Sequence, residues 1–271
     1  MDPPAQPRRG GPVSVLCERI AVSLGRNPVL HGVDMVARPG EVTAIVGPNG
    51  SGKTTLLRAI TGEVAFSGSV RIGGLDPARA KPWELSARRA VLPQAAALAF
   101  PFTVIEVVRL GLAQAAERHG PDLAERALAR VGLGGQGDRL FQELSGGQQQ
   151  RAQLARVLVQ VWQPVGEDGA RWLLLDEPVA ALDIAHQLEV MQVIRDYADR
   201  GGGVIAVMHD LNLTSLTADR VVLMAGGRVR AAGAPGEVMT DATLSEVYGC
   251  RLRVGVAPAD GSPFVLPHSA A

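Results

Sequence analysis

Cysteine is scarce in this sequence of 271 residues, and so are aromatic residues and long apolar runs. Cys17 and Cys250 lie far apart and form no CxxC pair, so the sequence indicates two free thiols and argues against a zinc or redox centre. No apolar run approaches the roughly 20 residues that span a bilayer, and residues 1–12 lack the apolar core of a signal peptide. We therefore expect a chain that stays in the cytoplasm.

An excess of charge of one sign is also missing. The 27 Lys and Arg residues balance 27 Asp and Glu residues, which gives no support for a nucleic-acid partner. Lysine itself is nearly absent, because Lys53 and Lys81 are the only two. An arginine-biased sequence keeps a lysine where a compact ammonium group fits and a planar guanidinium does not. Lys53 lies in such a context, whereas Lys81 is interpreted as a solvated surface residue.

The hydrophobic pattern predicts an α/β fold. Strands are predicted over 13–36 around a turn at 25–28, and over 41–46 and 69–72, with a helix over 53–61. Apolar strands at 172–175 and 203–208 flank a helix with one apolar face, and such βαβ units predict a mainly parallel core sheet. A hairpin over 220–232 is predicted to turn at Gly226-Gly227.

Domain organisation follows from changes in composition. Alanine- and leucine-rich segments predict a helical insertion over about 83–162. Residues 13–255 are expected to form the folded domain, residues 1–12 a flexible N-terminal segment, and the Pro- and Ala-rich residues 256–271 a loosely packed tail.

A glycine-rich loop follows the strand that ends at Val46. Residues 47–54 read GPNGSGKT and fit the pattern G-x-x-x-x-G-K-[ST]. The pattern lies between a buried strand and a helix start, which argues against a chance glycine-rich turn. Glycines let successive backbone N–H groups face phosphate groups. Lys53 would reach the β- and γ-phosphates of ATP, and Thr54 would ligate Mg²⁺. The predicted ATP-binding residues of this segment are Gly47, Pro48, Asn49, Gly50, Ser51, Gly52, Lys53, Thr54 and Thr55.

Two carboxylates end the apolar strand that starts after Arg171. Acidic turn residues after buried strands are common, so Asp176 and Glu177 alone are moderate evidence. Beside a phosphate-binding loop they matter more, because ATP with Mg²⁺ needs a carboxylate on the adjacent strand end and an acid or base for the attacking water. Asp176 suits the first role, with Mg²⁺ held through water, and Glu177 the second.

A second helix start carries serine and glycine. Leu144-Ser145-Gly146-Gly147-Gln148 opens a helix near Gly146, and the plain interpretation is an N-cap serine before a flexible turn. That interpretation leaves unexplained why the chain has a second helix N-terminus able to bind phosphate.

GPNGSGKT, LSGGQ and LLLDEP, in this order, resemble the Walker A, signature and Walker B motifs of ATP-binding cassette (ABC) ATPases, over about residues 13–254. The resemblance implies the P-loop NTPase fold of that family, with an N-terminal antiparallel β subdomain and a helical signature subdomain. It also implies a head-to-tail homodimer, in which LSGGQ of one subunit covers the γ-phosphate bound by the other subunit.

The same resemblance assigns roles to other positions. Gln94 resembles the glutamine that senses Mg²⁺ and water and links to a transmembrane partner, Asp183 belongs to a segment similar to the D-loop, and His209 resembles the histidine that contacts the γ-phosphate. Two positions depart from the family. Leu24 stands where an aromatic side chain usually stacks on adenine, so we expect aliphatic contact instead, and Ala180 stands where serine is common.

Longer segments resemble the ATPases of importers for iron-siderophores, vitamin B12 and haem. These segments are 91–111, 171–191 and 206–214, while the loop 164–170 and the closing LSEVYGC favour the haem branch. The resemblance implies an ATPase coupled to transport that uses ATP and Mg²⁺ at the cytoplasmic face of the inner membrane. The implied partners are a separate permease and, indirectly, a periplasmic haem-binding protein. Haem itself is not expected to bind this chain, because His31, His119, His186 and His268 form no paired ligand pattern.

Three alternatives remain open at this stage. The chain could serve a related siderophore or vitamin B12 importer. A P-loop kinase or small-molecule transferase would need an acceptor pocket and a lid in place of LSGGQ. A cassette ATPase without a transport role would bind nucleic acid or ribosomes and should carry a basic patch, which zero net charge does not support.

Overall fold

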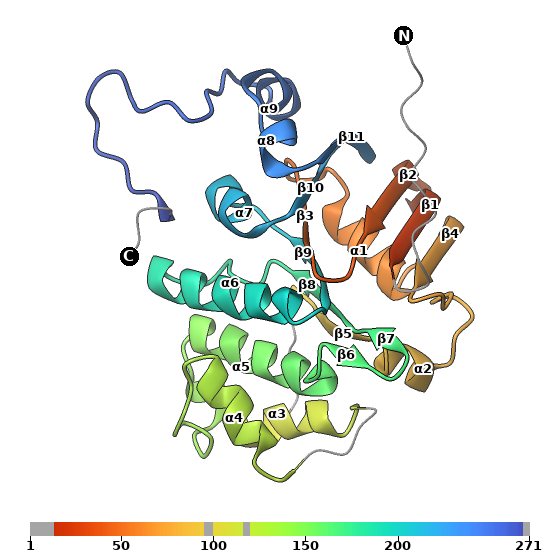
Figure 1. Ribbon diagram of the computed structural model, residues 1–271, viewed down its shortest axis with the longest axis vertical. Coiled ribbons are helices and arrows are strands. Elements are labelled where there is room, and N and C mark those ends of the chain that lie inside the picture. Colours follow the sequence, from red (N-terminus) through yellow and green to blue (C-terminus); the bar gives the residue numbers. More distant parts are fainter. Residues whose placement is uncertain (1–13, 95–99, 116–119, 268–271) are drawn as a thin grey trace.

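The computed structural model describes residues 14–94, 100–115 and 120–267. A six-stranded sheet in the order β11-β10-β3-β9-β8-β5 forms its centre, and all neighbouring pairs are parallel except β10 with β11 (Figure 1). Its strands are β3 (Val42–Val46), β5 (Arg89–Leu92), β8 (Trp172–Asp176), β9 (Gly203–Val207), β10 (Arg220–Ala225) and β11 (Arg228–Gly233). The predicted mainly parallel core sheet is confirmed.

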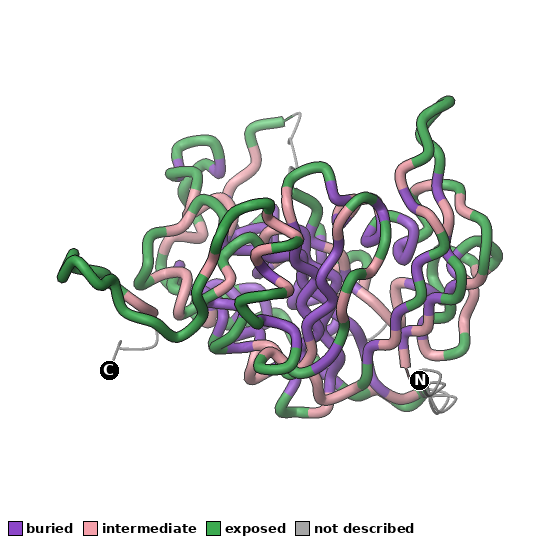
Figure 2. Tube along the Cα trace, turned by 90° about the horizontal axis from the view of Figure 1, so that it is seen from above, coloured by how far each residue is buried: buried purple, intermediate pink, exposed green. Residues whose placement is uncertain are grey.

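Three adjacent interior strands of this sheet are buried on both faces. β3, β8 and β9 are apolar runs of five residues in which every residue is buried. Side chains alternate across the sheet, so Trp172 and Leu174 enter one core cluster while Leu173 and Leu175 enter the other. Two covered faces explain why these strands are continuous apolar runs rather than alternating ones. Buried residues accordingly concentrate along the centre of the trace (Figure 2).

An antiparallel three-stranded sheet packs beside the central sheet. It has the order β2-β1-β4, with β1 (Val15–Leu24), β2 (Asn27–Ala37) and β4 (Ser67–Ile72). The turn between β1 and β2 begins at Gly25, whose φ of 62° favours glycine. α1 (Lys53–Thr61) packs between this sheet and the central sheet, and its bounds match the predicted helix. The expected N-terminal antiparallel β subdomain is therefore present.

The opposite side of the molecule is helical (Figure 1). It contains α3 (Val104–Leu112), α4 (Leu123–Arg130) and α5 (Gly146–Leu158), which contact one another, with the short helices η1 (Phe141–Glu143) and η2 (Val159–Val161). The predicted helical range 83–162 begins too early, because it includes β5, a strand paired with β8 in the central sheet. α2 (Pro82–Ser86) precedes that strand.

The remaining elements connect and close the central sheet. They are the hairpin strands β6 (Val165–Gly166) and β7 (Gly169–Ala170), α6 (Ile184–Asp199), α7 (Leu211–Thr217), α8 (Pro235–Val238) and α9 (Asp241–Tyr248). The hairpin β10–β11 turns at Gly226-Gly227 as predicted. The loop expected at 164–170 is the small β6–β7 hairpin.

The two chain ends differ in what the structure describes. The expected flexible segment 1–12 lies outside the described residues, as do His119 and His268. The described part of the tail, 256–267, is irregular and mostly exposed. Within the described ranges, no helix combines the length and the apolar character needed to cross a membrane.

Candidate functional site

The glycine-rich loop connects the end of β3 to the start of α1. Its glycines are required by geometry, since Gly47, Gly50 and Gly52 have φ values of 147°, 76° and 98°. A Cβ atom at Gly47 would collide with the carbonyl oxygen of Met224 in β10, and one at Gly52 would lie 2.7 Å from Leu30 Cδ2. The absence of side chains at these glycines lets the loop pack closely against β10 and Leu30.

Lys53 lies at the base of this loop, at the first position of α1. Its Nζ donates hydrogen bonds to the carbonyl oxygens of Gly47 at 2.8 Å and Pro48 at 3.1 Å, and the residue is only 5% exposed. Burial lowers the pKa of Lys53, while the carboxylates of Glu177 and Asp176 raise it. An ammonium group with few water contacts is ready to bind an anion.

Thr54 and Asp176 meet although 122 positions separate them. Thr54 Oγ1 donates to Asp176 Oδ1 at 3.2 Å. Burial raises the pKa of Asp176, and the hydrogen bond from Thr54 opposes this shift. The expectation that Asp176 ends the strand adjacent to the loop is wrong, because β9 lies between β3 and β8. Asp176 still reaches Thr54, and a hydroxyl with a carboxylate is the hard oxygen pair that Mg²⁺ prefers.

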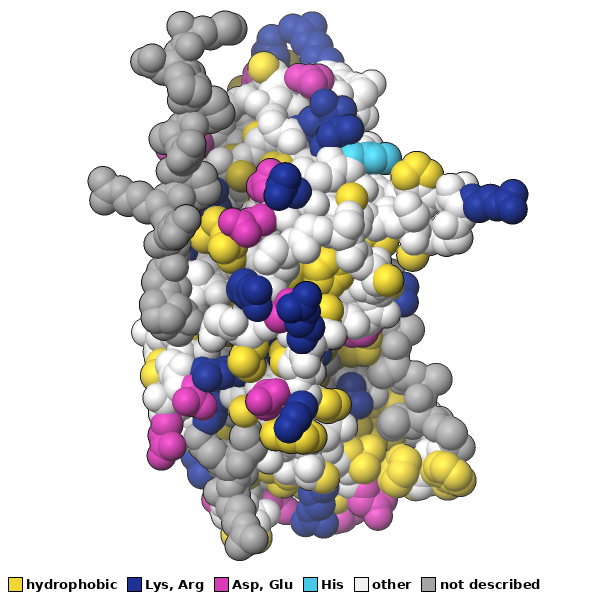
Figure 3. Space-filling view, turned by 90° about the vertical axis from the view of Figure 1, so that its right-hand side faces the viewer, with side chains coloured by type: hydrophobic (Ala, Val, Ile, Leu, Met, Phe, Trp, Pro, Cys, Tyr) yellow, Lys and Arg dark blue, Asp and Glu magenta, His cyan; other side chains and the backbone are white. Residues whose placement is uncertain are grey.

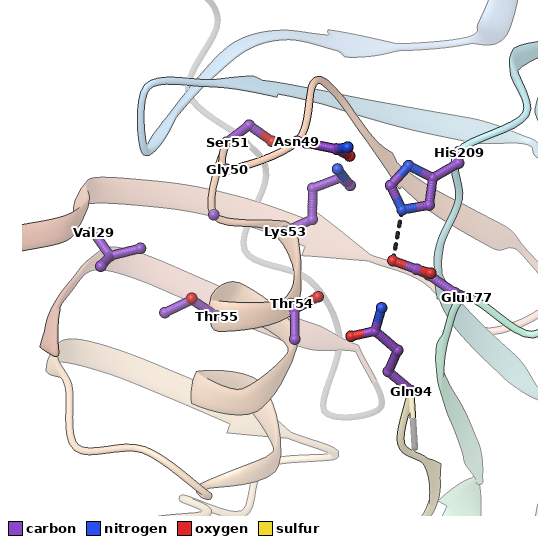
Figure 4. Close-up of a pocket in the computed structure, with 11 residues that line it drawn as sticks. Val29, Asn49, Gly50, Ser51, Lys53, Thr54, Thr55, Gln94, Glu177 and His209 are labelled. Carbon is purple, nitrogen blue, oxygen red and sulfur yellow. Dashed lines mark hydrogen bonds and ion pairs between the residues drawn. The ribbon is translucent and has the colours of Figure 1, made fainter. Parts of the chain in front are cut away.

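Glu177 and His209 face each other across the same cavity. Glu177 Oε1 lies 2.6 Å from His209 Nε2, and the Glu177 side chain is 16% exposed. Glu177 directly follows β8, while His209 lies shortly after β9, next to β8 in the sheet. Gln94 approaches from the segment after β5, and its amide points toward Thr54 (Figure 4). Three neighbouring strands thus deliver three polar side chains to one edge of the sheet.

These groups surround a cavity of about 500 Å³. Its lining comes from the glycine-rich loop, the start of α1, β2 and the three strand ends just described. The lining residues are Val29, Asn49, Gly50, Ser51, Gly52, Lys53, Thr54, Thr55, Gln94, Glu177 and His209. The cavity thus has a cationic, amide-rich end beside the loop and an acidic end at Glu177.

Leu24 does not line this cavity. It ends β1 with 44% of its surface exposed, and Val29 of β2 supplies the apolar lining. Sequence reasoning did not identify Val29, because no motif distinguishes it from other strand residues. The aliphatic contact expected of Leu24 thus stays a prediction, tested by substitution below.

The signature segment lies on a different surface of the chain. Ser145 caps α5, since its Oγ accepts from the Gln148 N–H at 3.3 Å and Gln148 Oε1 accepts from the Ser145 N–H at 3.0 Å. Leu144 anchors the segment in the core, while Ser145 and Gly146 are exposed. Among the described residues that line the 500 Å³ cavity, none is from this segment.

A second cavity of about 420 Å³ lies between the signature helix and the strand ends. Gln94 and Glu177 line both cavities, so the two are neighbours. Ala180 and Ala181 border the second one and are exposed, and Asp183 caps α6 by accepting from the His186 N–H at 3.0 Å. Sequence reasoning missed Gln150, which lines this cavity from α5; the only signal was its place in a run of three glutamines.

A transition metal or haem iron would need suitable side-chain ligands close together. Among the residues that the structure describes, no group of three or more His, Cys, Asp and Glu side chains has an arrangement able to hold a metal ion. Cys17 is buried in β1 and Cys250 is exposed after α9, and both are free thiols as predicted.

Comparison with known proteins agrees with this geometry. The family model described as "ABC transporter" matches residues 30–180. The chain is 62% identical over 253 residues to the "Hemin import ATP-binding protein HmuV" of Jannaschia sp. (strain CCS1), which covers 93% of this chain and 94% of that protein. It is 56% identical over 255 residues to the protein of the same name from Rhizobium johnstonii, with 93% and 96% covered.

Solved structures show the same fold. "Structure of ATP binding subunit of ABC transporter" aligns with a TM-score of 0.73 at 21% identity, covering 88% of this chain and 94% of that one. The ADP conformation of MJ1267, "an ATP-binding cassette of an ABC transporter", aligns with a TM-score of 0.72 at 24% identity, covering 86% and 97%. This chain therefore belongs to the ABC transporter family, as an ATP-binding subunit with the ABC ATPase fold.

Proposed function

We propose that this chain is the ATPase subunit of an importer that energises the uptake of haem through a separate permease. The observation that carries the substrate is the identity of 55–62% to proteins named hemin import ATP-binding protein, over nearly the whole chain. ATP hydrolysis is supported by the cavity itself, which places Lys53, Glu177 and His209 around one space.

The roles of the cavity residues follow from their chemistry. The loop 47–52 and the first turn of α1 bind the phosphates with backbone N–H groups, and the Lys53 ammonium neutralises their charge. Glu177 orients and polarises the attacking water as a general base. His209, in hydrogen-bond contact with Glu177, holds that carboxylate and contacts the γ-phosphate. Gln94 lies on the β5 side, from which it would contact the same water and Mg²⁺.

Mg²⁺ fits the oxygen atoms that this site offers. Thr54 Oγ1 would ligate it directly, Asp176 through water, and Gln94 would complete the set. When bound, the ion neutralises charge on the β- and γ-phosphates. The buried Asp176 and the Thr54 hydroxyl already lie in contact, so the protein holds these two groups in place for the ion.

We further infer a head-to-tail homodimer. Ser145 and Gly146 are exposed and form a capped helix start. Neither residue is among the described residues that line the 500 Å³ cavity of the same chain. In a dimer this helix start would close the partner's cavity over the γ-phosphate. Asp183 lies near that interface, at the start of α6.

The proposed location is the cytoplasmic face of the inner membrane, where the permease would hold the dimer. Residues 13–255 would form the ATPase domain, and 256–271 a tail. A periplasmic haem-binding protein would be an indirect partner. A nucleic-acid partner is not proposed, because the net charge of the chain is zero. On the one face shown in Figure 3, basic and acidic side chains are interspersed.

Growth tests distinguish haem from the substrates of related importers. A strain without this protein should fail to grow with haem as sole iron source, and should still use an iron-siderophore and vitamin B12. Growth should return with the wild-type gene and not with the Lys53→Ala variant. Normal growth on haem with loss of siderophore or vitamin B12 use would move the assignment to that related substrate.

A further inference from the structure

Three consecutive glutamines, Gln148 to Gln150, lie near the start of α5, and each makes a different contact. Gln148 completes the cap at Ser145. Gln149 donates to the carbonyl oxygens of Phe141 and Leu144, which lie within the same helical part of the chain. Gln150 alone among the three reaches out of this part, to the turn that follows β8.

Gln150 makes two hydrogen bonds to the backbone of that turn. Its Nε2 donates to the Glu177 carbonyl oxygen at 2.7 Å, and its Oε1 accepts from the Ala181 N–H at 3.1 Å. One partner only accepts and the other only donates, so the amide can have only one orientation. The two bonds hold the turn at both ends, at Glu177 and at Ala181, where the D-loop segment starts.

The backbone at Glu177 needs such support. Its φ of 53° lies in the left-handed region, which residues with side chains rarely adopt. Among the described non-glycine residues, Arg19 is the only other one with a positive φ. The Glu177 N–H donates to the Val207 carbonyl oxygen at 3.2 Å. The Glu177 carbonyl oxygen accepts from Gln150 Nε2 at 2.7 Å and, at the longer distance of 3.4 Å, from the Ala180 N–H. Both peptide groups of Glu177 are therefore held, which fixes the direction in which its side chain leaves the backbone, while the contact with His209 holds the carboxylate itself.

We propose that Gln150 is a positioning residue, which ties the aim of the Glu177 carboxylate to helix α5 and hence to the signature segment at its start. Because Ser145 and Gln150 lie on one rigid helix, a shift of the signature segment on ATP binding would be transmitted to Glu177 through this amide. The proposal rests on the proposed function, in which Glu177 activates the attacking water.

Two substitutions separate the two hydrogen bonds. Gln150→Leu removes both with little change of volume. Gln150→Glu keeps an acceptor for the Ala181 N–H but sets a second carboxylate oxygen against the Glu177 carbonyl. Each should lower kcat about tenfold to hundredfold, the loss caused by a small misplacement of a catalytic group, while the KM for ATP changes less than about threefold.

The matched control is Gln187→Leu. Gln187 donates from α6 to the Val179 carbonyl oxygen at 3.4 Å, so it bonds the same turn at a residue other than Glu177 and Ala181. Its kcat should remain within about twofold of the wild type. An equal loss in this variant would show that general stiffness of the turn matters, and would overturn the assignment to Gln150.

A double-variant cycle in single-turnover hydrolysis decides the mechanism. In a Glu177→Gln background, Gln150→Leu should lower the residual rate less than about twofold, because the group that it positions is already gone. An undiminished further loss would contradict the proposal, as would a wild-type rate for Gln150→Glu. If wild-type protein hydrolysed no ATP, the proposed function would fail instead, so the two failures are distinguishable.

Discussion

Replacing Glu177 by glutamine separates catalysis from nucleotide binding. The amide keeps the size of the carboxylate and its neighbour His209, 2.6 Å away, but it is a poor base. Loss of a general base lowers a rate about 10²- to 10⁴-fold, equivalent to about 3–5 kcal/mol of activation free energy. The glycine-rich loop and Lys53 are unchanged, so ATP should still bind.

The charge at Glu177 also affects affinity. Two unit charges 4 Å apart interact by about 1 kcal/mol in bulk water and about 4 kcal/mol near a protein surface. Removing a negative charge from a cavity that receives phosphates should therefore favour binding. We expect ATP to bind between unchanged and about fivefold tighter, a gain of up to about 1 kcal/mol.

The assay measures phosphate release and ATP dissociation on the same preparations. Glu63→Gln is the control, because that exposed carboxylate pairs with Arg58 at 3.7 Å and is not among the residues that line the cavity. It should leave both quantities unchanged. Hydrolysis by the Glu177 variant within about threefold of the wild type would refute the role of Glu177 as general base. Binding weakened tenfold or more would show that the carboxylate holds the site together instead.

Three further predictions concern other parts of the chain. Leu24→Tyr should tighten ATP binding about fivefold, the scale of about 1 kcal/mol for an added aromatic contact, and an unchanged dissociation constant would place Leu24 away from the base. At pH 8, iodoacetamide should label Cys250 and spare Cys17 until the protein unfolds, which mass spectrometry can show. Burial raises the pKa of Cys17 to about 12, and only the thiolate reacts. Because the thiol of the unfolded chain ionises first, the free energy of unfolding should fall as the pH rises from about 9 toward 12. In a Glu177→Gln background, dimers that mix Lys53→Ala subunits with Ser145→Ala subunits should occlude about one ATP per dimer. If each site combines Lys53 of one subunit with Ser145 of the other, both substitutions fall in one site and the second site is intact. Occlusion no greater than in either single-variant homodimer would exclude sites shared between subunits.

Much of the fold was predictable where a long apolar run meets a strong turn signal. β3 and α1 flank a glycine-rich loop, and the β10–β11 hairpin turns at two glycines, so their positions follow from local sequence. β5 was not predicted, because its sequence RAVL is only four residues long and does not alternate polar with apolar residues. Its pairing with β8 is a tertiary fact that the sequence does not display.

The site shows the same division. The motifs predicted that Thr54 and Asp176 lie close together, and the structure shows a hydrogen bond between them. The strands that precede these two residues, β3 and β8, are not neighbours, because β9 lies between them. The apolar lining could not be predicted, because the β1–β2 register shifts between Val22 and Ser23, near the start of the turn, and register decides which side chain faces the cavity. Gln150 was missed since both of its partners are backbone atoms distant in sequence.

Haem transport in reconstituted vesicles tests the central claim most directly. Vesicles that contain the cognate permease and this chain, with the haem-binding protein supplied on the opposite side, should accumulate haem only when ATP is present on the side of this chain. Vesicles with the Glu177→Gln variant should bind ATP and accumulate none. Haem accumulation at the wild-type rate without hydrolysis, or ATP hydrolysis that never moves haem across the membrane, would contradict the account.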